Sequence, residues 1–332
     1  MSEILIGKYY YHLPFYRQSK LFKNLGLELP DNTIAGWAMQ SAEQLEPLGI
    51  ALWRELGHIR ALQADETRVK ILEPDKKGYM FLYHSYLPDK RFVIFDFNLS
   101  RAGEIINERL KDFTGLLQTD GYSGYNTQRD REDVITFGCW DHARRKYTDV
   151  IKGCGNNKSG KAGQMLKKIA ELYKVEAEIK DKSFSARKTA RQERSTKILK
   201  VIKSFVDKIN APPNSLLGKA VTYTKNQWTE LTRYVEHGEA QISNCWVENL
   251  VRPFAVGRRN WLFMGNEQSA QKAALIYSLI QSALLNDLDP RAYLEYVLNQ
   301  VHRMRRREVD PATLLPHTID RSLLEKSTDD KV

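Results

Sequence analysis

Three strand-like segments follow one another between residues 61 and 97, and they limit the folds that this chain can adopt. Residues 61–72, 79–86 and 92–97 have the periodicity of β-strands. The turns between them, at residues 76–78 and 88–90, are short enough to join antiparallel neighbours. The sequence therefore predicts a sheet that begins as an antiparallel meander.

The segments that follow alternate between helix and strand. We expect a helix over residues 102–113, a fourth strand that carries Asp120, a short helix, a fifth strand over residues 134–139 and a helix from Asp141. Antiparallel hairpins followed by such crossovers give a mixed sheet covered by helices. The order βββαβαβα matches the ribonuclease-H-like fold, so the predicted class is α/β with a mixed α+β sheet.

Residues 12–57 have a helical pattern that is broken at Gly26 and again at residues 30–32. Two helices separated by a break are one way to build a DNA-reading pair. Because no dense basic face accompanies them, we interpret them as a cap that packs on the next domain.

Basic charge is concentrated in one part of the chain. The 332 residues contain 51 Lys and Arg against 41 Asp and Glu, a formal net charge of +10, and residues 152–210 alone contain sixteen basic against six acidic side chains. A uniform surplus of like charge repels itself and favours a polyanionic partner over a merely solvated helix surface. Apolar side chains repeat at helical spacing over residues 198–209 and 217–235. We therefore predict an all-helical insertion that binds DNA.

The predicted organisation has five parts. They are a helical N-terminal segment (1–60), the first part of the ribonuclease-H-like core (61–151), the basic helical insertion (152–239), the second part of the core (240–300) and a weakly ordered C-terminal tail (301–332). The core is thus expected to be interrupted by the insertion.

Cysteine usage and the lack of export signals indicate an intracellular location. The three cysteines are odd in number and widely spaced, which argues against disulfides and fits a reducing compartment. The sequence shows neither a signal-peptide pattern nor an apolar run of membrane-spanning length. We expect a cytoplasmic protein associated with the nucleoid.

Acidic residues stand beside two of the strand-like segments. Asp65 lies at the head of residues 68–72, and Asp120 follows a short apolar run and precedes two glycines that allow a turn. A third acid, Glu248, lies far downstream in a helical segment. Carboxylates on a sheet are costly to bury unless a cation compensates them, so this arrangement predicts a metal site.

Six collinear blocks of sequence are more specific than any single acid. They are residues 12–18 (HLPFYRQ), 64–67 (ADET), 120–126 (DGYSGYN), 138–146 (GCWDHARRK), 257–263 (GRRNWLF) and 288–290 (LDP). Together they resemble the insertion sequence 66 family of bacterial transposases. The catalytic domain of that family has a ribonuclease-H-like fold with an Asp-Asp-Glu triad.

The resemblance implies that Asp65, Asp120 and Glu248 form the triad and hold two Mg²⁺ ions, with Mn²⁺ as the alternative. Two such ions, about 3.5 to 4 Å apart, activate a water or a 3′-hydroxyl and stabilise the leaving oxygen during attack on a phosphodiester. Magnesium keeps several waters, so three carboxylates are sufficient. The alternative is that the aspartates cap turns and that Glu248 pairs with Arg252 on a helix surface. Alternation along a strand points Glu66 away from Asp65, so Glu66 is expected to be structural.

Basic side chains near the triad and in the insertion are predicted to contact DNA phosphates. They are Arg144, Arg145, Lys146, Arg258 and Arg259 near the triad, and Lys197, Lys200 and Lys203 in the insertion. Trp140 and Trp261 either stack on an exposed base or, more simply, pack in the core.

Cys139 and His142 have the spacing of a zinc half-site. A structural zinc needs four ligands and no second pair lies nearby, so we expect no zinc. We predict instead that His142 contacts DNA or the metal-bound phosphate, with a buried structural histidine as the alternative.

The chain departs from the family pattern at three points. Residues 242–249 read ISNCWVEN, whereas the family commonly has Asp-Asn-Asn before the glutamate and Arg after it. Gln63 stands where a histidine is usual. Family members also carry an N-terminal region with a cysteine-rich zinc-binding module, and this chain starts after it.

The function implied by the resemblance is that of a DNA transposase, which cleaves element ends and joins them to target DNA. One alternative is a hydrolytic nuclease of the same fold, and another is a catalytically inactive DNA-binding remnant. The expected partners are double-stranded DNA at element ends and target, further copies of the chain on DNA and accessory transposition proteins. No membrane partner is expected.

Overall fold

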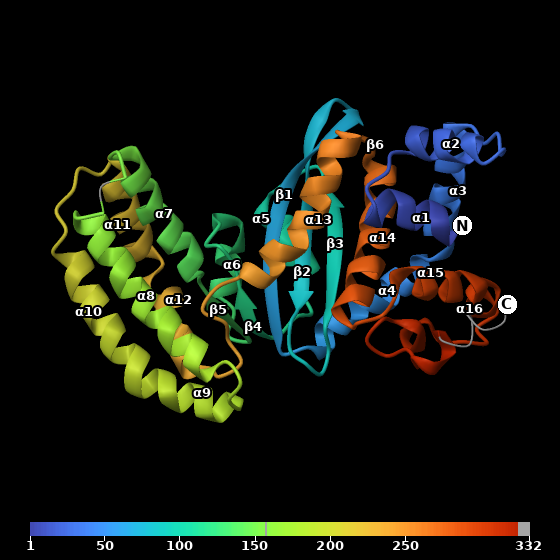
Figure 1. Ribbon diagram of the computed structural model, residues 1–332. Coiled ribbons are helices and arrows are strands. Elements are labelled where there is room, and N and C mark those ends of the chain that lie inside the picture. The colour runs from blue at the N-terminus through green and yellow to red at the C-terminus, as the bar shows by residue number, and fades with distance from the viewer. Residues whose placement is uncertain (157, 325–332) are drawn as a thin grey trace. The chain divides into compact units, whose positions relative to one another are not determined.

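The computed structural model describes residues 1–156 and 158–324, and the chain divides into two compact units (Figure 1). Unit 1 contains residues 1–114 and the residues from 246 onward, whereas unit 2 contains residues 115–245. Both units combine helices with strands, and the strand pairs are antiparallel as well as parallel, which confirms the predicted mixed α/β class. None of the described helices is both long and apolar enough to cross a bilayer.

Unit 1 is built on three antiparallel strands. β1 (Ala61–Glu73) pairs with β2 (Lys76–Ser85), and β2 pairs with β3 (Phe92–Asn98). The short β6 (Met264–Asn266) runs parallel to the end of β1. The predicted meander is therefore confirmed.

The predicted turn at residues 76–78 is wrong. These three residues belong to β2 and pair with residues 69–71 of β1, so the connection consists of Pro74 and Asp75 alone. Ladder pairing over ten positions of the two strands outweighs the local turn preference of Gly78, since strand formation depends strongly on tertiary context.

The register of the meander sorts the side chains of β1 onto two faces. Asp65 lies opposite Leu82, which lies opposite Phe95 on β3, so these three side chains share one face. Glu66 shares the other face with Asp96. The neighbouring acids of β1 therefore meet different surroundings.

Helices supply most of the rest of unit 1. They are α1 (Ser2–Leu5), η1 (Ile6–Tyr10), α2 (Phe15–Asn24), α3 (Asp31–Gln44), α4 (Glu46–Arg54), η2 (Glu55–His58), α5 (Gly103–Arg109), α13 (Cys245–Trp261), α14 (Glu267–Leu285), α15 (Pro290–Asn299), α16 (Val301–Arg305) and η6 (Pro311–Leu314). α5 is shorter than the predicted helix over residues 102–113. α3 buries Ile34 and Ala38 and packs against α2 and α14, which supports its interpretation as a packing element.

Two long helices pack on β3. The ring of Phe95 lies 6.3 Å from Phe254 of α13 and 5.5 Å from Tyr277 of α14, measured between ring centroids. β3 is an edge strand, and α14 covers its open edge (Figure 1). The hydroxyls of Ser278 and Ser282 accept the N–H groups of Phe95 and Val93 at 2.8 and 3.0 Å. Backbone groups that a further strand would otherwise pair are satisfied by side chains.

The predicted weakly ordered tail is wrong for residues 301–324. α16 and η6 lie in this segment, and Leu314 and Leu315 are buried. The hydroxyl of Tyr293 on α15 donates to the carbonyl of Leu314 (3.0 Å), and η6 packs against α4. Apolar side chains in an otherwise polar segment bury themselves on these helices. Residues 325–332 lie outside the described part.

Unit 2 contains a parallel strand pair and a larger set of helices. β4 (Gly115–Gln118) pairs with β5 (Val134–Phe137). The helices are η3 (Ser123–Tyr125), α6 (Asn126–Arg129), α7 (Trp140–Gly153), α8 (Lys161–Ile179), α9 (Phe184–Ala190), η4 (Arg191–Ser195), α10 (Thr196–Asp207), α11 (Leu216–Asn226), α12 (Trp228–Thr232) and η5 (Arg233–Glu236). α7 packs against α8 and α11, and α8 packs against α10 (Figure 1).

The predicted helix over residues 217–235 is divided in the structure. α11 ends at Asn226, Gln227 leaves helical geometry and α12 follows. α10 forms within the predicted repeat over residues 198–209, but its buried side chains are Leu199, Ile202 and Val206, whereas the predicted Ile198 and Phe205 are only half-buried.

Candidate active-site residues in the two units

Asp65 and Glu248 belong to unit 1, on two elements that are directly joined. The N–H of Val247, in the first turn of α13, donates to Oε1 of the buried Gln63 on β1 (3.1 Å). Such N–H groups have no acceptor within their helix, so Gln63 satisfies one of them and fixes the start of α13 on β1. Asp65 lies two residues after Gln63 on the same face, and Glu248 follows Val247. Both carboxylates are half-buried.

The far end of α13 is also attached to β1. The guanidinium of Arg258 donates to the hydroxyl of Thr67 (3.2 Å) and to the carbonyl of Arg68. Thr67 shares the face of Asp65, so α13 lies along that face at both ends. Arg258, which we predicted to contact phosphate, is thus engaged with β1, whereas Arg259 is exposed.

The alternative role for Glu248 was a surface ion pair with Arg252. Arg252 is exposed and makes no ion pair or hydrogen bond within the described part of the chain. The helix-surface pair is therefore not formed.

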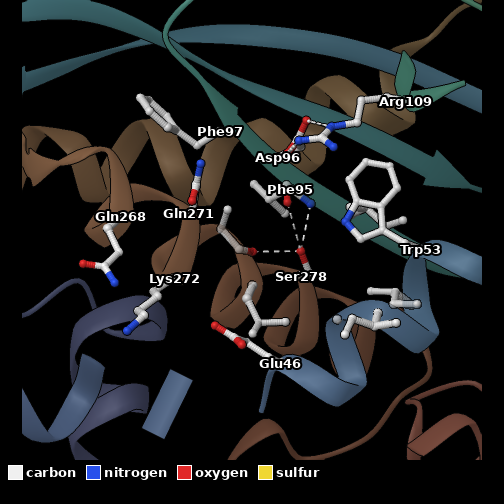
Figure 2. Close-up of a pocket in the computed structure, with 16 residues that line it drawn as sticks. Glu46, Trp53, Phe95, Asp96, Phe97, Arg109, Gln268, Gln271, Lys272 and Ser278 are labelled. Atoms are coloured by element: carbon white, nitrogen blue, oxygen red, sulfur yellow. Dashed lines mark hydrogen bonds and ion pairs between the residues drawn. The ribbon is translucent and has the colours of Figure 1, made fainter. Parts of the chain in front are cut away.

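The opposite face of the meander holds charges that neutralise one another. Glu66 forms an ion pair with Arg101, as strand alternation predicts for a structural acid. Arg109 donates to both oxygens of Asp96 at 2.8 and 3.1 Å, beside Trp53 (Figure 2). Asp96, Arg109 and Trp53 line a cavity of about 450 Å³ at the β3 edge. Burial raises the pKa of Asp96, and its bonds to Arg109 oppose that rise.

Asp120 belongs to unit 2 and lies in a turn two residues beyond the end of β4. One of its carboxylate oxygens accepts the N–H of Tyr122 (2.8 Å), and its carbonyl accepts the hydroxyl of Tyr223 on α11 (2.7 Å). Burial raises the pKa of Tyr223 well above its usual value, so the hydroxyl remains a donor. Helices of the predicted insertion therefore hold the loop that carries Asp120.

The backbone conformation of the loop after Asp120 depends on Gly121. Its φ of +88° lies in the left-handed region, and a Cβ there would come within 2.8 Å of the Gln227 side chain. Gln227 in turn accepts a hydrogen bond from Arg129 (2.9 Å). The break between α11 and α12 thus supplies a side chain that packs directly on the turn after Asp120.

α7 carries the Cys-x-x-His pair and the first basic cluster. Cys139 is buried and its Sγ accepts the N–H of Asn244 (3.5 Å), while His142 is half-buried one turn further on. Trp140 is fully buried and its indole N–H donates to the carbonyl of Leu231 (2.7 Å), so it has a core role. Trp261 on α13 is also buried.

The basic side chains of unit 2 differ in their exposure and in the contacts that they make. Arg144 pairs with Asp141 (2.8 Å), and the ammonium of Lys146 lies 4.6 Å from the centroid of the Tyr223 ring. Arg145 is exposed. In α10, Lys197 and Lys200 are exposed, whereas Lys203 pairs with Asp207 (3.1 Å).

Sequence reasoning missed Gln63, Tyr223 and Gln227 as positioning residues. Gln63 is 184 residues from Val247, and Tyr223 is 103 residues from Asp120. No local pattern reports contacts over such separations. The one available signal was that Gln63 replaces the usual histidine beside Asp65.

Comparison with known proteins places this chain among the transposases, which process DNA. The family described as "Transposase IS66 family" matches residues 1–272, and the chain belongs to that family.

The chain is also similar to two curated proteins of one organism, both described as uncharacterised. The chain is 32% identical over 317 residues to the uncharacterised protein y4jD of Sinorhizobium fredii, covering 90% of this chain and 61% of the relative. It is 28% identical to y4hP of the same organism, covering 91% and 58%. The chain therefore spans about three fifths of the relatives' length. No solved structure matches it.

Proposed function

We propose that this chain catalyses the metal-dependent cleavage and strand transfer of DNA for an insertion element, with Asp65, Asp120 and Glu248 as metal ligands. The observation that carries the proposal is the attachment of α13 to β1 through Gln63 and Val247. It brings the helix of Glu248 onto the face of β1 that holds Asp65, within one unit.

The residues present fit hard divalent cations. Carboxylate oxygens are the ligands that Mg²⁺ and Mn²⁺ prefer, and half-buried carboxylates without a cation are costly. Bound ions would activate the attacking oxygen and stabilise the leaving one. Asp65 and Glu248 supply ligands from unit 1, and Asp120 supplies the third from a turn that Tyr223 holds in place.

Contacts with DNA phosphates are assigned first to four exposed basic side chains, which are Arg145, Lys197, Lys200 and Arg259. Arg144, Lys146, Lys203 and Arg258 make contacts within their own units and join this surface as supporting residues. His142 is assigned to the phosphate next to the metal ions. In a ribonuclease-H-like core, residues 152–239 would then be the DNA-binding insertion.

The DNA partners in this proposal are the element ends and the target, bound by more than one copy of the chain, with accessory transposition proteins.

The test is a cleavage assay on duplex DNA that contains an element end, with Mg²⁺ or Mn²⁺. We expect Asp65→Asn, Asp120→Asn and Glu248→Gln each to lower cleavage by more than the roughly 10- to 100-fold loss typical of outer-shell changes at metal sites. DNA affinity should remain, because no phosphate contact is removed. Asp89→Asn, an exposed acid between β2 and β3, is the matched control and should retain full activity.

Strand transfer separates a transposase from a hydrolytic nuclease. Joining of cleaved ends to a target plasmid supports the proposal, and cutting without joining assigns the chain to the nuclease class. Absence of metal-dependent cutting by the wild type would identify a DNA-binding remnant.

A further inference from the structure

A second cavity of unit 1, of about 600 Å³, is lined by aromatic rings from η1, α2, the end of α13 and the residues that follow it. Tyr16 and Phe263 line it and are 46% and 42% exposed. Phe15 and Trp261 form deeper parts of the wall. Aromatic surfaces exposed in a concave site favour a flat ligand.

One cation lies in the wall of this cavity. The Nζ of Lys8 is 4.7 Å from the centroid of the Phe15 ring and 5.9 Å from that of Trp261. Within the described residues it forms no ion pair with a carboxylate, including Asp31, which lines the same cavity. Burial lowers the pKa of Lys8 from 10.5 to about 8. A half-buried ammonium that has aromatic neighbours but no carboxylate partner is costly, and an anionic ligand would relieve that cost.

The cavity lies at the end of a helix that begins beside Glu248. Arg252 and Arg259 follow Glu248 by four and eleven positions, which places all three on one stripe of α13. Trp261 is thirteen residues from Glu248, or roughly 20 Å along the helix axis. Thirteen residues also place Trp261 about 140° around the helix from that stripe, so a DNA strand that lies on Glu248 and the two exposed arginines would turn around the end of α13 to enter the cavity.

We propose that this cavity binds one unpaired nucleotide of the DNA substrate, with the base against the rings of Tyr16 and Phe263 and a phosphate on the ammonium of Lys8. The inference rests on the proposed function for the identity of the ligand. Stacking rings beside a cation are the combination that holds single-stranded nucleic acid without reading its sequence. An apolar protein segment would leave Lys8 without a counter-charge.

The test compares two DNA duplexes of equal length, one blunt and one with a three-nucleotide single-stranded overhang that contains 2-aminopurine. Binding is measured by anisotropy in EDTA, so that cleavage plays no part. Wild type should prefer the overhang by about tenfold, the magnitude of one base stacked on an aromatic side chain. The 2-aminopurine fluorescence should be quenched on binding.

Lys8→Met keeps the aliphatic length and removes the charge. We expect the overhang preference to fall to about one while affinity for blunt DNA is unchanged. Lys20→Met is the matched control, since Lys20 is exposed and lies 5.8 Å from the centroid of the Tyr16 ring but does not line the cavity. Phe263→Ser, at an exposed position, should also lose the preference and the quenching.

Two further readouts distinguish a ligand-binding lysine from a structural one. Lys8→Met should raise Tm, because it removes a half-buried charge that has no carboxylate partner. A lower Tm would contradict the idea that the Lys8 ammonium destabilises the ligand-free protein. Phosphate binding raises the pKa of Lys8 above about 8, so the overhang preference should be complete below pH 8 and be lost as the pH rises through the bound-state pKa.

Equal affinity of the wild type for both duplexes overturns the proposal, as does a preference that Lys8→Met and Phe263→Ser leave intact. Displacement by an acidic, aromatic peptide without any overhang preference would assign the cavity to a protein segment instead. Asp65→Asn should keep the overhang preference, so failure of the cleavage proposal and failure of this one are separable.

Discussion

Asp65 and Asp120 are held by different means. Asp65 lies inside the 13-residue strand β1, where ten consecutive pairs with β2 fix the direction of its side chain. Asp120 lies beyond the four-residue strand β4, in a turn that depends on Gly121 and on side chains of α11 and the residue after it. Main-chain register positions the first acid, whereas tertiary side-chain contacts position the second.

This difference predicts different responses to substitution. A side-chain change near Asp65 should act through the stability of unit 1, because the ladder itself survives. A side-chain change near Asp120 should act through the geometry of one turn and lower activity with little effect on stability.

Two glycines provide the largest contrast. Gly121→Ala places a side chain at a left-handed φ and within 2.8 Å of Gln227, and a displacement of the turn by about 1 Å should lower cleavage about a hundredfold. Gly78→Ala in β2 places its Cβ 2.4 Å from the Phe97 ring and should destabilise unit 1 by about 1 to 3 kcal/mol. Cleavage rates and urea unfolding of both variants measure the contrast. Equal losses of stability in the two variants would show that Asp65 and Asp120 do not differ in this way.

Gln63→Leu should lower both the stability of unit 1 and the rate of cleavage. It leaves the N–H of Val247 without its acceptor, which costs about 1 to 3 kcal/mol, and frees the start of α13 beside Glu248. Gln18→Leu is the control, because Gln18 is also buried and bonds to the carbonyl of Leu13 (3.0 Å) away from the acids. The control should lose stability and keep cleavage once folded. If Gln63→Leu retained wild-type cleavage, Gln63 would not position Glu248.

Tyr223→Phe removes one hydrogen bond to the carbonyl of Asp120. We expect about a fivefold loss of cleavage, corresponding to the roughly 1 kcal/mol that such a bond contributes. Tyr293→Phe removes the equivalent bond to Leu314 in unit 1 and should change Tm alone. A similar fall in cleavage for both variants would show a general loss of folded protein.

The smallest expected effect is on the salt dependence of DNA affinity. Lys197→Ala, Lys200→Ala and Lys203→Ala together should flatten the slope of log affinity against log salt by about 2, since each neutralised phosphate contributes about 0.9 and Lys203 is already paired with Asp207. The control combines Lys70→Ala, Lys76→Ala and Lys77→Ala on the β1–β2 hairpin of unit 1. An unchanged slope in the first set would show that these lysines are only solvated.

Local periodicity was sufficient for much of the fold. Alternation along β1 separated Asp65 from Glu66, and the register and the Glu66–Arg101 pair agree with it. α10 also buries side chains at helical spacing, whereas the repeat over residues 217–235 is divided between α11 and α12. Such patterns depend on a residue's immediate neighbours, which the sequence states directly.

The remaining features depend on contacts between distant residues. Ladder pairing moved the β1–β2 turn away from residues 76–78, and burial of Leu315 ordered a segment that composition made look like a tail. The partners of Gln63 and Tyr223 lie more than a hundred residues away. Neither charge nor periodicity encodes these distances, so the supports of the candidate site emerged only from the structure.

The serine hydroxyls that close the edge of β3 have a consequence for self-association. An unpaired edge strand is the usual route by which one copy of a protein adds its sheet to another, in productive assembly and in aggregation alike. Because Ser278 and Ser282 occupy the N–H groups of Phe95 and Val93, this route is closed along β3. Any association between copies of the chain is therefore expected to use surfaces other than the edge of β3.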